Sequence, residues 1–182
     1  MAADENATPA PAAADTDVQR KLQALRAQLR ESFGNIVMAL MALPRYRDQT
    51  LGDLRHLVIE PLMRDRLVTA YVGEGERPVG GEVAGIALWA SVSEEVDASI
   101  RRQIREGVFP IRLKPDDWNS GPINWLLDVV AGDKAMTARV IANFRQVVKE
   151  GGLRLHPLIA RLVDEETLAK MGVEKTSAGG TG

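Results

Sequence analysis

The stretch KPDDWNSGPINWLLDVVAGD, from Lys114 to Asp133, contains the segment that decides the fold. A polar, glycine-containing turn separates two tryptophans, and an apolar run follows the second one. The run INWLLDVVA has the length and residue types of a buried strand. One carboxylate, Asp128, interrupts it. Because a buried charge without a partner is costly, Asp128 requires a structural or a chemical explanation.

The composition limits the classes of protein to consider. The chain has 182 residues, of which 45% are hydrophobic and 26% charged, and no apolar run approaches the roughly 20 residues of a membrane span. With no cysteine and two distant histidines, we expect neither disulfides nor a bound metal. The N-terminus MAADENATPAPAAADTD is acidic and lacks the apolar core of a signal peptide, which favours a cytoplasmic location.

The charges are distributed unevenly. Three cations, Arg101, Arg102 and Arg105, gather in the segment SIRRQIREGVFPIRLK, and Arg45 and Arg47 form a second basic spot. The first group is either an ordinary solvated helix surface or a docking surface for an acidic partner. The net charge of −2 and the absence of interleaved aromatics argue against nucleic-acid binding.

Helical periodicity marks the N-terminal part of the chain. Residues 1–16 are rich in Ala, Pro and Asp, so we expect a disordered tail. From Asp17, apolar residues recur at steps of three and four, which predicts a helix that ends before Pro44. Thr50 begins a second helix, which Pro61 kinks or ends. The stripe of the first helix comprises Leu22, Leu25, Leu29, Phe33, Ile36, Val37 and Leu40.

The period then changes to that of strands. RLVTAYVG and RPVGGEVAGIALWASVS predict two or three strands of an antiparallel meander, with VGEGE and VGGEVAG as hairpin turns. Ser93 caps a helix that Gly107 ends. VFPIRLK is expected as an edge strand, DKAMTARVIANFRQVVKEGG as a helix and LRLHPLI as a last strand. The order of elements predicts one α+β domain over residues 17–163, with a loose tail over 164–182.

Three motifs resemble, in order and spacing, the family of RTX toxin-activating lysine acyltransferases. They are LWASVSEE (Leu88 to Glu95), DDWNSG (Asp116 to Gly121) and NWLLDVVA (Asn124 to Ala131). The resemblance extends from about Phe33 to Pro157. It implies a fold like that of the GCN5-related N-acetyltransferases, with a mixed, mainly antiparallel sheet flanked by helices.

The resemblance also implies a reaction and its partners. A fatty acyl group would pass from acyl carrier protein to internal lysines of an RTX-type protoxin in the cytoplasm, and a homodimer is possible. The Gln-x-x-Gly-x-Gly loop that holds coenzyme A in ordinary acetyltransferases is absent. We therefore expect no bound cofactor and acyl-ACP as the acyl donor.

In this family the carboxylate of the Trp-x-x-Asp strand pairs with a catalytic histidine, and that carboxylate corresponds to Asp128. The histidine belongs to a Ser-Pro-x-His-Arg segment, which matches LPRYRD, Leu43 to Asp48, at Pro44 and Arg47. Tyr46 occupies the histidine position. A phenol, with a pKa near 10, is a weaker base than imidazole near neutral pH.

The presence of Tyr46 at the histidine position leaves three alternatives. Tyr46 acts as an acid or hydrogen-bond donor beside Asp128 as the base, or His56 reaches the site from the second helix, or the protein binds without catalysing. His156 lies outside the matched motifs and is assigned no role. A noncatalytic binder of carrier or toxin, and a small-molecule N-acyltransferase, are the alternative functions.

Six further residues are candidates for binding substrate. The tryptophans are either core or the lining of an acyl channel, and the polar residues are either donors to an oxyanion or parts of ordinary turns. These candidates are Trp89, Ser91, Trp118, Asn119, Ser120 and Trp125.

Overall fold

The computed structural model describes residues 11–71, 83–149 and 152–163. The chain divides into two compact units, Met1–Gly34 and Asn35–Gly182. Helix α1 (Pro11–Met41) begins in the first unit and ends in the second. Residues 11–16 are therefore helical, although we expected them in the tail. Four apolar side chains of α1 in the first unit are exposed, namely Val18, Leu22, Leu25 and Leu29.

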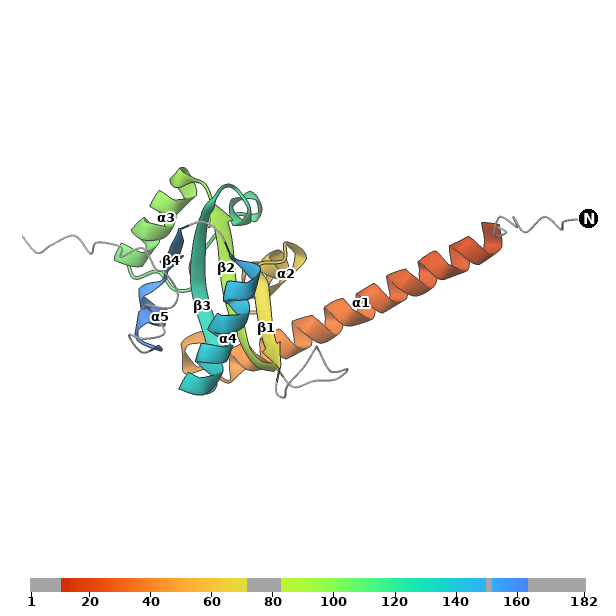
Figure 1. Cartoon of the computed structure of the whole chain (residues 1–182), viewed down its shortest axis with the longest axis horizontal. Coiled ribbons are helices and arrows are strands. Elements are labelled where there is room, and N and C mark those ends of the chain that lie inside the picture. Colours follow the sequence, from red (N-terminus) through yellow and green to blue (C-terminus); the bar gives the residue numbers. More distant parts are fainter. Residues whose placement is uncertain (1–10, 72–82, 150–151, 164–182) are drawn as a thin grey trace, which may run out of the picture. The chain divides into compact units, whose positions relative to one another are not determined.

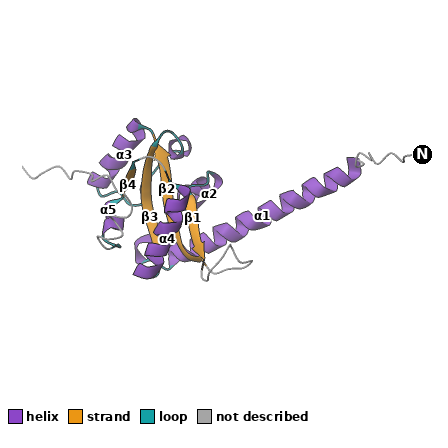
Figure 2. Cartoon of the chain, in the orientation of Figure 1, coloured by secondary structure: helices purple, strands orange, loops and turns teal. Residues whose placement is uncertain are grey.

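The second unit is built on a four-stranded sheet with the order β1-β2-β3-β4 (Figures 1 and 2). Strands β1 (Leu67–Tyr71), β2 (Val83–Val92) and β3 (Ile123–Ala131) pair antiparallel. Strand β4 (Leu153–Leu155) pairs parallel with β3, as the crossover through α4 (Lys134–Val147) requires. The expected α+β class is confirmed, and the likeness to GCN5-related acetyltransferases stays a prediction.

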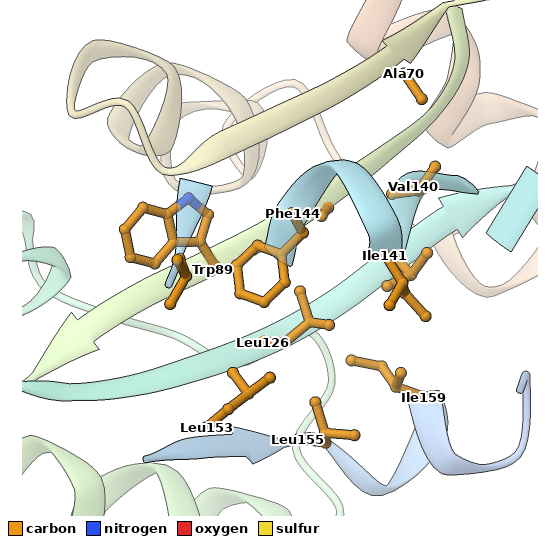
Figure 3. Close-up of a cluster of buried hydrophobic side chains, with 12 residues drawn as sticks. Ala70, Trp89, Leu126, Val140, Ile141, Phe144, Leu153, Leu155 and Ile159 are labelled. Carbon is orange, nitrogen blue, oxygen red and sulfur yellow. The ribbon is translucent and has the colours of Figure 1, made fainter. Parts of the chain in front are cut away.

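Each face of the sheet has its own core. Figure 3 shows Trp89 beside Phe144 of α4. The centroids of the two rings lie 6.0 Å apart. Leu126 and Val129 of β3 belong to this α4 side. On the opposite face lie Ile100, from α3 (Glu94–Arg105), and Trp118, from the short helix η3 (Pro115–Trp118). The same cluster contains Leu88, Ala90, Val92, Trp125 and Leu127.

A β-bulge in β3 interrupts the alternation of side chains. Trp89 lies opposite Leu126, and the preceding residue of β2, Leu88, lies opposite Asp128. Leu127 is therefore the extra residue. Asp128 consequently shares the face of Leu88 and not that of Leu126. In an unbroken strand Leu126 and Asp128 would share one face, because side chains alternate with a period of two.

Buried polar contacts join α3 to the sheet. Trp125 donates its indole N–H to Asp97 at 2.7 Å, and Arg154 of β4 forms an ion pair with the same carboxylate. Arg101 adds a third contact at 3.0 Å. These contacts satisfy a carboxylate that α3 places against the sheet, and they fix Trp125 as a core residue. Both predicted ends of α3 are confirmed. The Ser93 side chain accepts a hydrogen bond from the Val96 amide, and Gly107 follows the helix with a φ of 71°.

Two segments differ from expectation because prolines lack an N–H donor. VFPIRLK forms no strand; the side chain of Gln103 bonds instead to the backbone N and O of Arg112, at 2.8 and 3.0 Å. The second helix is irregular: a π-helical turn, η2 (Arg55–Ile59), precedes α2 (Glu60–Met63). Pro61 offers no hydrogen to the carbonyl of Leu57, which accounts for the wider turn before it.

The last strand is shorter than expected. It ends at Leu155, and His156 caps the short helix α5 (Pro157–Ala160). The expected tails over 1–10 and 164–182 and most of the hairpin glycines lie outside the described residues. Within the described ranges, no helix combines the length and apolarity needed to cross a membrane.

Candidate active site

Asp128 is buried at the centre of β3 and is held by four donor groups. Arg45 reaches both carboxylate oxygens, with Nη2 3.0 Å from Oδ1 and from Oδ2, and Nε 3.2 Å from Oδ2. The Tyr46 hydroxyl donates to Oδ2, and the Val129 amide donates to Oδ1 at 2.8 Å. Because an ionised carboxylate offers about four lone-pair sites, these donors satisfy the group.

The side chains of Arg45 and Tyr46 come from one tight turn after α1. Pro44 opens a 3₁₀ turn, η1 (Pro44–Tyr46), in which the Tyr46 amide donates to Leu43 O at 3.0 Å. The fixed φ of proline suits the first position of such a turn. Arg45 Nη2 also donates to Val129 O at 2.9 Å, so the turn is fastened to β3 at two consecutive residues. Tyr46 and Asp128 were predicted to lie together, and the structure places them in contact.

Burial keeps Tyr46 protonated. Desolvation raises the pKa of its phenol well above 10, and the Asp128 carboxylate raises it further, against a smaller opposing effect of Arg45. The side chain is therefore a hydrogen-bond donor at neutral pH. Its ring packs on Phe109 with centroids 5.4 Å apart.

His156 lies beside this group, although the sequence assigned it no role. Its ring is buried and stacks edge-on against Phe109, at 6.3 Å between centroids. Burial lowers its pKa, and the Asp128 carboxylate acts in the opposite direction. Nδ1 accepts the Leu158 amide at 3.2 Å, so the neutral ring carries its proton on Nε2. His156 therefore caps α5 through Nδ1, and its Nε2 carries the N–H.

His56 lies in a different environment. Burial lowers the pKa of His56, and the nearby charge of Arg112 lowers it further. The Asp53 carboxylate raises it by a smaller amount. Asp53 and Arg112 form an ion pair at 3.1 Å. No contact of His56 with Tyr46 or Asp128 occurs among the described residues. The geometry therefore does not support His56 as the replacement base.

The predicted substrate-binding residues fall into two groups. Trp118 and Trp125 are fully buried in the core, as the core alternative predicts. Trp89 lines an open pocket of about 530 Å³ on the α4 side together with Ser91, and the Arg66 guanidinium lies 4.2 Å from its ring centroid. Ser91 and Asn119 both bond to Arg66, at 3.1 and 2.6 Å.

Ser120 also has a structural role. Its hydroxyl accepts the Ser93 amide at 3.0 Å and donates to Asp117 O at 3.0 Å. Gly121 follows in close contact, since a Cβ there would lie 2.7 Å from the backbone N of Ser93. The NSG turn therefore seals the end of β2, and the Ser120 hydroxyl is occupied by backbone partners.

The three arginines of α3 are not equivalent. Arg101 is half-buried and engaged with Asp97, whereas Arg102 and Arg105 are exposed. A docking surface on this helix would rest on the latter two.

Sequence reasoning missed Arg45 as a partner of Asp128. It assigned the motif match to Arg47, which is exposed. The available signal was the basic spot around Tyr46, because a buried carboxylate needs a cation. Arg45 and Arg47 both adjoin Tyr46, so the sequence does not choose between them.

A family model described as the RTX toxin acyltransferase family matches residues 25–152. The match includes both Tyr46 and Asp128. The chain belongs to this family, and it is an acyltransferase that acts in RTX toxin activation. No curated protein matches the chain.

Proposed function

We propose that this chain transfers a fatty acyl group from acyl carrier protein to the ε-amine of internal lysines in an RTX protoxin. The family supplies the acyltransferase activity, and the absence of a coenzyme A loop in the sequence favours a carrier protein as donor. The observation that carries the proposal is the hydrogen bond from the buried Tyr46 hydroxyl to Asp128, at the position where the family pairs a histidine with this carboxylate.

The pair suggests a proton relay. A phenol that donates its hydrogen keeps lone pairs that accept another. As the neutral lysine amine attacks the thioester carbonyl, Tyr46 accepts the amine proton while its own proton passes to Asp128 along the existing bond. The C–N bond forms, the C–S bond breaks, and the proton returns through Tyr46 to the leaving thiolate. The products are an amide and a free carrier thiol.

Arg45 and Asp128 have distinct roles in this scheme. The four donors leave Asp128 little capacity to take a proton directly from lysine, so transfer through Tyr46 replaces the direct base expected from sequence. Arg45 fixes the carboxylate in a forked contact and opposes its negative charge. His156 supports Phe109, against which the Tyr46 ring rests.

A transfer assay with acyl carrier protein and protoxin, read by mass spectrometry of the lysines, tests the proposal. Tyr46→Phe keeps the ring and removes the relay, so the rate should fall by roughly 10² or more. His56→Ala is the matched control and should retain activity. Full activity in Tyr46→Phe with loss in His56→Ala would move the role to His56. A wild type that binds carrier or protoxin and transfers nothing would support a noncatalytic binder.

A further inference from the structure

An apolar pocket of about 330 Å³ lies against Tyr46. We call it the Tyr46 pocket. The last turns of α1 form one wall, and the segment before and within η2 forms the other. Its apolar lining consists of Val37, Leu40, Met41, Leu51, Leu54 and Leu57.

The rim of this pocket exposes apolar surface. Leu51 is 87% exposed and Met41 is 77% exposed. Single exposed apolar residues are ordinary on a protein surface, but these two flank the same cavity. Methionine adapts its shape to different neighbours, which suits a wall that receives a flexible ligand. The lining residues of the described chain include no carboxylate, so nothing in the pocket favours a cationic occupant.

Four polar residues complete the lining of the pocket, namely Tyr46, Arg47, Gln49 and Thr50. Tyr46 lines the pocket, and its hydroxyl is bonded to Asp128. Gln49 also lines it, and its buried Oε1 has no hydrogen-bond partner among the described residues. An unsatisfied buried acceptor is costly, and an N–H of a bound ligand would satisfy it. The pocket therefore combines apolar walls with polar atoms next to the proposed relay.

We propose that the Tyr46 pocket receives the hydrocarbon chain of the acyl donor and selects its length. The assignment rests on the proposed acyl transfer. A linear acyl chain matches the apolar walls, and the thioester at its end would lie near Tyr46. The thioester itself has no donor, so the N–H for Gln49 Oε1 would come from an amide of the carrier's phosphopantetheine arm. Each methylene that the pocket covers should improve kcat/KM about fourfold, until the pocket is full. The tryptophans, for which the sequence left core and acyl channel as alternatives, are not needed for this role.

The test compares full-length variants with octanoyl and palmitoyl carriers. Leu54→Trp fills the pocket and should lower the palmitoyl-to-octanoyl ratio of kcat/KM tenfold or more. Leu51→Trp, at the exposed rim, should change the ratio in the same direction and is the variant to use if Leu54→Trp misfolds. Met63→Trp is the control, because Met63 is 61% exposed and lies outside the pocket lining.

The expected result is a changed ratio in the two pocket variants and a wild-type ratio in Met63→Trp. An unchanged ratio in folded Leu54→Trp or Leu51→Trp overturns the assignment. A changed oligomeric state in Leu51→Trp with an unchanged ratio would also overturn it, in favour of a second copy of the chain as the occupant.

A second measurement separates this inference from the proposed function. If the wild type transfers no acyl group from any carrier, the proposed function fails. Binding of a fluorescent long-chain fatty acid then decides whether the Tyr46 pocket holds a hydrocarbon chain. Weaker probe binding in Leu54→Trp than in Met63→Trp supports the pocket. Equal binding in the two variants rejects it.

Discussion

Leu88 of β2 lies opposite Asp128 of β3, although regular pairing from Trp89 and Leu126 would place Leu127 there. The bulge turns the carboxylate away from the α4 side of the sheet, where Leu126 and Val129 lie. It directs the group towards Arg45 and Tyr46. A strand that carries a bulge next to a reactive group is a frequent means of re-aiming a side chain.

Asp128→Asn should abolish acyl transfer and weaken the fold. Asparagine keeps the volume but replaces one acceptor oxygen by an amide that faces the donors Arg45 and Tyr46. The mispaired buried group should cost about 1–3 kcal/mol in the free energy of unfolding. Urea unfolding and the transfer assay at a temperature where the variant is folded measure the two effects. Turnover that survives in the folded fraction would make Asp128 purely structural.

Arg45→Lys tests the forked contact. Lysine keeps the charge but donates from a single nitrogen, so it does not hold both oxygens as Nε and Nη2 do. We expect the unfolding free energy to fall by roughly 1–2 kcal/mol and the transfer rate to fall further. Arg55→Lys, whose side chain is 79% exposed, is the control and should stay within about 0.5 kcal/mol of wild type. Equal behaviour of the two variants would remove Arg45 from the site.

The two histidines should make the fold sensitive to acid. Burial lowers the pKa of both His56 and His156 from 6.5. Below about pH 6.5 the unfolded chain therefore binds protons that the folded chain does not, so stability is lost as pH falls towards the lowered values. The loss amounts to about 1.4 kcal/mol for each unit of separation between folded and unfolded pKa.

His156→Asn and His56→Ala isolate this effect. Asparagine still accepts the Leu158 amide as a helix cap but does not titrate. Each variant should lose less stability than wild type between pH 7.5 and pH 5, as measured by urea unfolding at both values. Parallel losses in all three proteins would assign the acid sensitivity to the carboxylates.

Sequence periodicity predicted the central strands and the capped helix α3 because their patterns are local. Ser93 and Gly107 bound α3 as expected, and INWLLDVVA is β3. The bulge at Leu127 was not predictable, because its evidence is the pairing of β3 with β2. The contact of Arg45 with Asp128 joins residues 83 positions apart, and no local rule selects Arg45 over Arg47. The Tyr46–Asp128 contact was predicted through the family motif, which carries long-range information that periodicity lacks.

The last prediction concerns recognition of the acyl carrier protein. Arg102 and Arg105 are exposed on α3, whereas Arg101 is engaged with Asp97. Exposed charges mainly set the association rate and its dependence on salt. Arg102→Glu with Arg105→Glu should weaken binding to an acidic carrier most strongly at low ionic strength and leave the melting temperature unchanged. Lys134→Glu with Arg161→Glu makes the same change in net charge at exposed positions elsewhere and is the control. Surface plasmon resonance at two salt concentrations measures both pairs, and equal weakening would show an effect of net charge in place of a docking surface on α3.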